Sequence, residues 1–298
     1  MSDHFTSEPV VRVDRLTRSF GDKRALDELT IEVPRGGVFG LIGGNGAGKT
    51  TLLRHLTGML RAQSGAVRVF GMDPVTQPVQ VLSRIGYLSE ERDLPNWMRV
   101  GELLKFTQAF YPDWDAKYAE ELREAFDLDP KVRVRNLSRG QRARAGLLTA
   151  LAHRPDLLIL DEPSSGLDPV VRRDILGAII RTIADEGRTV LFSSHLLDEV
   201  ERVADRVAII HEGRILLNAD IDSLKESHRR FTVRFRESFA DAPALVGMIA
   251  CRGSGMEWTY TCNGDAKQIR SAAQALGAEI LDESSLSLDE VFVSRIGV

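Results

Sequence analysis

Residues 43–50 read Gly43-Gly44-Asn45-Gly46-Ala47-Gly48-Lys49-Thr50, and this stretch decides the fold of the chain. It fits the pattern G-x-x-x-x-G-K-[ST], which is typical of a phosphate-binding loop between a strand and a helix. The apolar segment 37–42 predicts a buried strand before the loop, and the apolar spacing over 51–60 predicts a helix after it. Backbone N–H groups of such a loop converge on an anion at the positive end of the helix. A chance glycine-rich turn is the alternative, and the full pattern in this context disfavours it.

The motif gives its side chains specific tasks. Lys49 is predicted to reach the β- and γ-phosphates, and the Thr50 hydroxyl is predicted to ligate Mg²⁺. ATP with Mg²⁺ is therefore the expected ligand pair. The candidate nucleotide-binding residues of this segment are Gly43, Asn45, Gly46, Ala47, Gly48, Lys49, Thr50 and Thr51.

Composition limits the function classes. The 298 residues are 43% hydrophobic and 28% charged, as in a soluble globular protein. The formal net charge of −4 disfavours a large nucleic-acid footprint, so no nucleic-acid partner is predicted. The two cysteines, Cys251 and Cys262, favour a reducing cytosol. The polar start lacks a signal-peptide core, and no stretch reaches the roughly 20 apolar residues of a membrane span. Any membrane role is expected to come through a partner.

The chain is predicted to have three parts. Residues 1–9 form a polar tail, residues 10–222 form an α/β domain, and residues 223–298 form a small α+β accessory domain. In the α/β domain, short apolar strands alternate with helices, which predicts a P-loop NTPase parallel-sheet core. An antiparallel β-subdomain lies near its start, and a helical subdomain is inserted at about 86–145.

The accessory domain shows strand alternation in two places. Phe231, Val233 and Phe235 alternate with polar residues, and so do the residues over 258–262. Short helices are predicted near 242–250 and 266–276.

An acidic pair follows a second apolar strand. The run 157–160 ends at Asp161 and Glu162. Asp161 can hold Mg²⁺, and Glu162 can deprotonate the attacking water as a general base. An ordinary acidic loop is the alternative. The strand before the pair and the phosphate loop upstream favour the catalytic interpretation.

A further segment brings the chain to a known family. Leu137-Ser138-Arg139-Gly140-Gln141 precedes a predicted helix, and Ser138 is expected to be its N-cap. With the loop and the acidic pair, it resembles the ATP-binding subunits of ABC transporters, whose signature is Leu-Ser-Gly-Gly-Gln. The resemblance runs from about Val10 to Leu217 in the family's order. It implies that two such subunits close head-to-tail around two ATP molecules. Ser138, Gly140 and Gln141 of one subunit would then face the γ-phosphate of the other.

The same resemblance assigns three more positions. Asp168 in the segment 165–168 matches the D-loop, which crosses the dimer interface. His195 matches the switch histidine that contacts the γ-phosphate, although a lone histidine is more often structural. Phe20 matches the aromatic residue that stacks on adenine, although a lone phenylalanine is normally part of a core.

Two positions depart from the family pattern. Glu90 stands where the family usually has a glutamine that touches Mg²⁺ and the attacking water, so Glu90 is a candidate metal ligand and catalytic residue. Arg139 stands where the signature has glycine. Its side chain either faces the partner's nucleotide or points to solvent, and the sequence leaves both open.

The resemblance also implies partners. The dimer would form from two copies of this chain or from this chain and a paralogue, and it would drive separate integral membrane permease subunits. The chain would then lie in the cytoplasm, peripheral on the inner face of the cell membrane. The helical subdomain and the Glu90 region are where the family docks such a partner. Leu288–Phe292 and Tyr111–Asp115 are similar to exporter-type, ABC-2-like members, which favours export.

Two alternatives come from other classes. One is a soluble ABC ATPase acting on the ribosome or on DNA repair, although such relatives carry two cassettes or long coiled coils. The other is a P-loop kinase, which the signature, the D-loop and the switch histidine together oppose.

Overall fold

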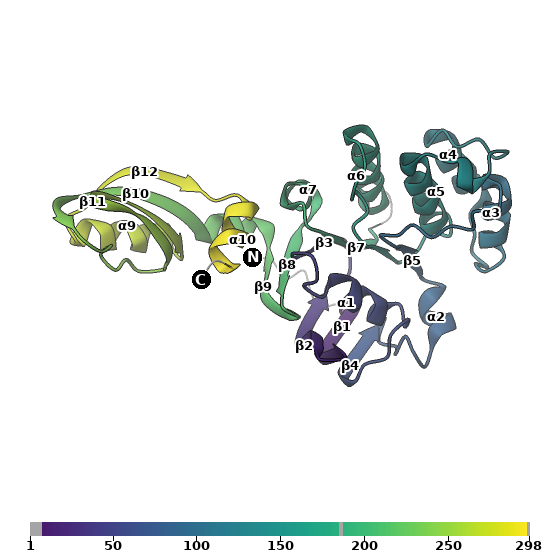
Figure 1. The fold of residues 1–298 in the computed structure, drawn as a ribbon, viewed down its shortest axis with the longest axis horizontal. Helices are drawn as coiled ribbons and strands as arrows, with labels where there is room; N and C mark the ends of the chain where they lie inside the picture. Colours follow the sequence, from purple (N-terminus) through teal and green to yellow (C-terminus); the bar gives the residue numbers. More distant parts are fainter. Residues whose placement is uncertain (1–7, 185–186, 297–298) are drawn as a thin grey trace. The chain divides into compact units, whose positions relative to one another are not determined.

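The computed structural model describes residues 8–184 and 187–296, and these form two compact units that divide after Asn218 (Figure 1). The sequence places the boundary later, after residue 222. The difference arises because helix α8 (Ile221–Ser227) buries Ile221 and Leu224 and belongs to the second unit. Residues 1–7 of the predicted tail lie outside the described residues.

A six-stranded sheet forms the centre of the first unit. Its strand order is β5-β6-β7-β3-β8-β9, and the pairs β5–β6, β6–β7, β7–β3 and β3–β8 are parallel. β6 and β7 are buried along their whole length, as expected of a parallel sheet covered on both faces. The predicted α/β fold class is confirmed. The strands are β3 (Gly37–Ile42), β5 (Ile85–Leu88), β6 (Leu157–Leu160), β7 (Thr189–Ser194), β8 (Arg206–His211) and β9 (Arg214–Asp220).

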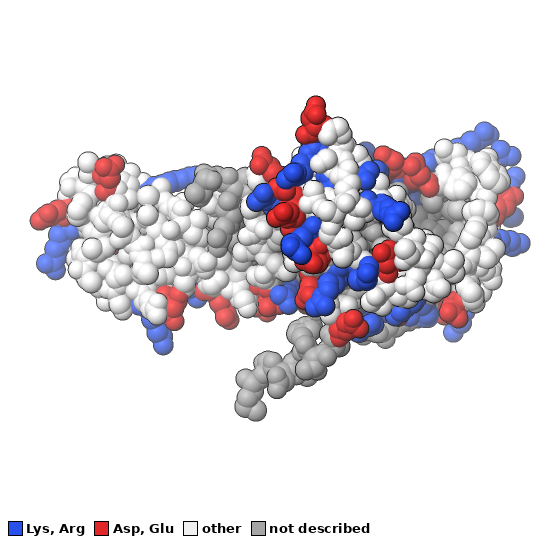
Figure 2. Space-filling model, turned by 90° about the horizontal axis from the view of Figure 1, so that it is seen from below, with Lys and Arg blue, Asp and Glu red and all other residues white. Residues whose placement is uncertain are grey.

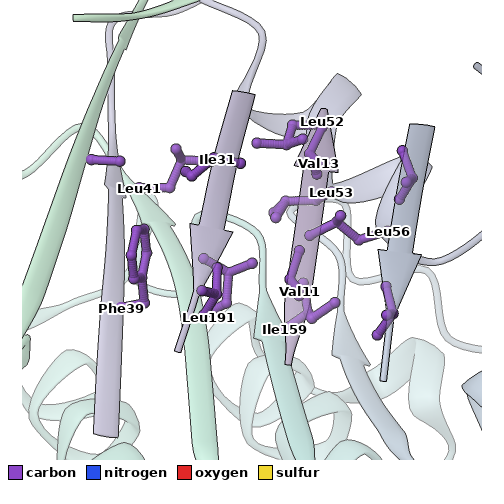
Figure 3. Packing of buried hydrophobic residues seen from close by; sticks show 14 of the residues in the cluster. Val11, Val13, Ile31, Phe39, Leu41, Leu52, Leu53, Leu56, Ile159 and Leu191 are labelled. Carbon is purple, nitrogen blue, oxygen red and sulfur yellow. The ribbon is translucent and has the colours of Figure 1, made fainter. Parts of the chain in front are cut away.

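An antiparallel sheet, β2-β1-β4, makes the predicted β-subdomain. It consists of β1 (Val11–Phe20), β2 (Lys23–Val33) and β4 (Ser64–Val69). Helix α1 (Lys49–Leu56) places its leucines in the same core as β1, β2 and the parallel strands (Figure 3). The helix ends before the predicted residue 60, because Gly58 takes a left-handed conformation with φ 72°.

Helices α5, α6 and α7 lie on the face of the parallel sheet opposite α1 (Figure 1). The helical subdomain predicted at about 86–145 contains α3, α4 and the first part of α5, but its predicted start is wrong. Residues 85–88 form strand β5, which is hydrogen-bonded to β6, so the subdomain's helices begin only at Val100. The helices of the first unit are α1, α2 (Pro78–Leu82), α3 (Val100–Gln108), α4 (Ala116–Ala125), the 3-10 helix η1 (Val134–Asn136), α5 (Arg139–Leu151), α6 (Pro169–Ala184) and α7 (Leu197–Val203).

The second unit is an antiparallel sheet with three helices. The strand order is β11-β10-β12, formed by β10 (His228–Phe239), β11 (Met248–Asn263) and β12 (Glu279–Ser285). Besides α8, the helices are α9 (Ala266–Ala275) and α10 (Leu288–Ile296). The predicted strands and the helix near 266–276 are confirmed.

The helix predicted near 242–250 is wrong. β11 begins at Met248, directly after Gly247, whose φ of 73° is left-handed. Asn263 N donates to Gly247 O at 2.7 Å, which closes the turn, and a proline at 243 disfavours a continuous helix. Among the residues that the structure describes, no helix has the length and apolar character needed to cross a bilayer.

Candidate active site

The phosphate loop connects the end of β3 to the start of α1, as predicted. Gly46 and Gly48 are left-handed, with φ of 78° and 115°. A Cβ added to Gly48 would lie 2.6 Å from the carbonyl oxygen of Ala25, so only glycine fits there. The buried Lys49 side chain folds back into the loop, where Nζ donates to the carbonyl oxygen of Gly43 at 2.7 Å. The ammonium group is therefore held inside the loop.

A chain of charged contacts leaves this lysine. Lys49 Nζ lies 2.9 Å from Glu162 Oε1, and Glu162 Oε2 lies 2.7 Å from His195 Nδ1. Glu162 is 5% exposed and has a φ of 46°, a left-handed conformation that residues other than glycine adopt rarely. Three residues from separate parts of the sequence thus meet at one carboxylate.

The neighbouring Asp161 is fixed by a residue that the sequence analysis missed. Ser193 Oγ donates to Asp161 Oδ1 at 2.7 Å and accepts from the backbone N of Glu162 at 2.9 Å. One hydroxyl therefore orients both members of the acidic pair. Its position at the end of a buried strand, two residues before His195, is the only signal the sequence carries.

Burial, and secondarily the charge of Asp161, raise the pKa of Tyr87 to about 12.

A pocket of about 390 Å³ opens above the loop. It combines predicted adenine, phosphate and catalytic residues in one space. Asp161 and His195 do not line the pocket. Both are linked by hydrogen bonds to Glu162, which does line it: His195 directly, and Asp161 through the hydroxyl of Ser193. Gly43 supplies a carbonyl to Lys49, and Ala47 is buried beneath the loop. The predicted residues that line the pocket are Phe20, Asn45, Gly46, Gly48, Lys49, Thr50, Thr51, Glu90 and Glu162.

Phe20 is 47% exposed at the mouth of this pocket, which suits a stacking surface better than a core position. The guanidinium carbon of Arg18 lies 4.8 Å from its ring centroid. Lys23, which the sequence analysis also missed, lines the same pocket. Its Nζ would lie 3.4 Å from a Cβ built on Gly46, so a second ammonium group stands beside the phosphate loop. The sequence signal was a basic residue close after Phe20, outside any motif.

The signature and D-loop residues lie elsewhere, at the starts of two helices. Ser138 Oγ accepts from Gln141 N at 3.1 Å, and Gln141 Oε1 accepts from Ser138 N at 3.0 Å, so the predicted N-cap of α5 is confirmed. A Cβ on Gly140 would lie 2.7 Å from Val171 of α6. Hydrogen bonds, first from Val171 N, lower the pKa of Asp168. None of the four predicted residues lines the pocket of its own chain.

Arg139 is exposed to solvent, which was one of the two expected directions, and it also contacts its own chain. It is the first residue of α5, and its Nη2 donates to the carbonyl oxygen of Ser165 at 3.4 Å. A Cβ on Gly166 would lie 2.3 Å from the same nitrogen. The side chain is therefore directed at the D-loop of its own chain.

The oxygen donors around the pocket fit Mg²⁺. Thr50 and Glu90 line the pocket, and Asp161 uses one carboxylate oxygen on Ser193. Hydroxyl and carboxylate oxygens are the ligands that this hard cation prefers. Across residues 8–184 and 187–296, no group of three or more His, Cys, Asp or Glu could hold a metal.

Comparisons with known proteins show which family the chain resembles. Residues 26–165 match a family model described as ABC transporter. The daunorubicin resistance ATP-binding protein DrrA3 of Streptomyces coeruleorubidus is 36% identical over 97% of this chain and 93% of its own length. The bacitracin transport ATP-binding protein BcrA of Bacillus licheniformis is 34% identical over 74% and 73%. A solved structure of an ATP binding subunit of an ABC transporter superposes with a TM-score of 0.67 at 28% identity, covering 72% of this chain and 92% of that chain.

Proposed function

The chain belongs to the ABC transporter family, and from this premise we propose that it is the ATP-hydrolysing motor subunit of an exporter. It binds and hydrolyses ATP, as its family does. The observation that carries the catalytic part of the proposal is the contact chain Lys49–Glu162–His195 at the wall of one pocket. Lys49 supplies a cation for the phosphates, Glu162 supplies a carboxylate for the attacking water, and His195 orients that carboxylate.

Nucleotide binding starts from groups already in place. Adenine would stack on the exposed ring of Phe20, and the triphosphate would occupy the loop over 43–50. Because Lys49 Nζ lies 2.9 Å from Glu162, the arriving phosphates compete with that carboxylate for the ammonium. Binding is therefore expected to release a Glu162 oxygen toward the γ-phosphate.

Glu162 would then act as the general base. Its released oxygen accepts a proton from the water that attacks the γ-phosphate. His195 Nδ1 lies 2.7 Å from the other oxygen and keeps the carboxylate oriented. Thr50, Asp161 and Glu90 would hold Mg²⁺, which neutralises phosphate charge when bound.

The second half of each site would come from another subunit. Ser138, Gly140, Gln141 and Asp168 lie away from the pocket of their own chain. The N-terminus of α5 carries a positive dipole suited to a phosphate of a facing chain. We infer a head-to-tail dimer, of two copies or with a paralogue, that closes on two ATP molecules and reopens after hydrolysis.

Separate membrane permeases would complete the transporter, with this chain on the inner face of the membrane. Exposed aromatic residues support a docking surface near the helical subdomain: Trp97 is 70% exposed and Phe110 is 64% exposed. Phe106 packs edge-on against Phe110 at 5.1 Å between ring centroids. Export is favoured by the drug-resistance and bacitracin-transport names of the similar proteins DrrA3 and BcrA.

A Glu162→Gln variant tests the proposal. The amide cannot take the proton from water, so ATP turnover should fall at least about 100-fold while nucleotide binding remains. Sedimentation velocity with saturating Mg-ATP should show a stable dimer for this variant. The Lys49→Ala/Glu162→Gln double variant is the control and should stay monomeric. A Glu162→Gln variant that remains monomeric with ATP bound would contradict the closing mechanism.

A further inference from the structure

The turn over 163–166 follows Asp161 and Glu162 directly, and an arginine from a distant loop holds it. Arg92 is 4% exposed. Its Nη2 donates to the carbonyl oxygens of Pro163 and Ser165, both at 3.0 Å. One guanidinium nitrogen thus binds two carbonyl oxygens of this D-loop turn, and its residue belongs to the loop that carries Glu90.

Arg139 reaches the same turn from the signature segment. Its Nη2 donates to Ser165 O at 3.4 Å, the carbonyl that Arg92 also uses. Burial lowers the pKa of Arg92, and the charge of Arg139 adds to that effect. Two cations sharing one carbonyl oxygen repel each other, so the arrangement persists only where the surrounding contacts require it.

The backbone at Arg92 is itself constrained. Its φ of 52° is left-handed, and Arg92 N donates to the carbonyl oxygen of Ser89 at 3.1 Å. That bond closes a turn whose interior residues include Glu90, which lines the nucleotide pocket. Such unfavourable backbone conformations persist where neighbouring contacts fix them. The backbone of Arg92 therefore closes the turn that carries Glu90, while its side chain holds the turn over 163–166.

We propose that Arg92 is a positioning residue that fixes the turn over 163–166, and with it Glu162, relative to Glu90. The inference rests on the proposed ATP hydrolysis in this pocket. It adds a structural connection between the two acidic residues that line the pocket, Glu90 and Glu162. Arg139 is the second and weaker hold on the same turn. Loss of Arg92 should misplace Glu162 while leaving the phosphate loop intact, because Lys49 Nζ is also held by the carbonyl oxygens of Gly43 and Gly44 within the loop.

The test compares Arg92→Met and Arg92→Lys in the full-length chain. Small displacements of catalytic groups cost up to about 100-fold in rate, so Arg92→Met should lower kcat by about 10- to 100-fold. The Kd for ATP should change by no more than about twofold. Arg92→Lys keeps one charged donor and should recover part of the rate. Arg188→Met is the matched control, because Arg188 also donates to a proline carbonyl, that of Pro155 at 3.2 Å. Its kcat should stay within about twofold of the wild type.

Two results would overturn the proposal. The first is a kcat within about twofold of the wild type in the soluble Arg92 variants. The second is an ATP Kd that rises by the same factor as kcat falls, which would mean collapse of the whole pocket. Arg92→Lys decides the question alone if Arg92→Met does not fold. Failure of the dimer mechanism is detected separately, because sedimentation of Glu162→Gln measures ATP-driven association directly, whereas the Arg92 test compares kcat between variants and wild type at one protein concentration.

Discussion

The chemistry of this molecule depends on residues in unfavourable backbone conformations. Glu162 and Arg92 both adopt left-handed φ values, 46° and 52°. For residues other than glycine this costs roughly 1–2 kcal/mol each. Glu162 recovers that free energy through Ser193 and Lys49, and Arg92 through two carbonyls of the D-loop. Two of the left-handed residues other than glycine in the described chain therefore stand at the carboxylate that the pocket needs fixed and at the arginine beside it.

Lys23 gives a prediction at the residue scale. A Lys23→Met variant should weaken ATP and ADP binding by about three- to tenfold, because an exposed ammonium beside phosphates contributes on the order of 1 kcal/mol. Salt should reduce the difference. Isothermal titration at two ionic strengths measures it.

The control for Lys23 is its neighbour. Arg24→Met removes a cation that is paired with Asp27 at 2.7 Å and should leave nucleotide affinity unchanged. An equal loss for adenosine, which has no phosphates, would contradict a phosphate role for Lys23.

At the scale of elements, local patterns predicted local structure well. The strand–loop–helix unit around 43–50 and the capping box at Ser138 depend on neighbouring residues, so the sequence carried them. The hydrogen bond of Arg139 was not predictable, because its acceptor is a carbonyl 26 residues later in the chain. The helix predicted near 242–250 is wrong for a similar reason, because the carbonyl oxygen of Gly247 accepts a hydrogen bond from Asn263 at the far end of β11.

The end of α5 gives a prediction about pH. The ring of His153 stacks on Tyr111 at 3.8 Å between centroids, and its Nε2 lies 3.0 Å from the carbonyl oxygen of Ile85. Burial lowers the pKa of His153 to about 4. The unfolded chain binds this proton near its ordinary value of 6.5, so stability is present above that pH and is lost as pH falls toward 4.

Between pH 7.5 and 5 this histidine should cost the folded state about 2 kcal/mol. A His153→Gln variant keeps an amide donor for Ile85 but does not titrate. Urea unfolding at both pH values should therefore show a smaller loss of stability in the variant than in the wild type. His211→Gln controls for removing an imidazole from the end of β8. Parallel pH dependence of wild type and His153→Gln would contradict the prediction.

At the scale of the whole molecule, each of the two units has a hydrophobic core of its own. The core of the first unit joins β1, β2, α1 and the parallel strands, and its last buried member by sequence is Ile210, with Ile215 packed against it. The core of the second unit begins at Phe231 and includes the buried Trp258. The candidate nucleotide site draws all its residues from the first unit. On the face shown in Figure 2, acidic and basic side chains are interspersed, in keeping with a net charge of only −4.

Separate cores predict separate unfolding. A ligand that binds only folded protein stabilises it by about 2.7 kcal/mol at 100 times its Kd, and here that gain should go to the first unit alone. The three tryptophans are Trp97, Trp114 and Trp258, so a Trp97→Phe/Trp114→Phe variant reports unfolding of the second unit by fluorescence. Mg-ATP should leave this fluorescence transition in place while it raises the calorimetric transition of the first unit. If both transitions moved upward together, the two units would unfold as one, and the accessory unit would contribute directly to the stability of the nucleotide-bound state.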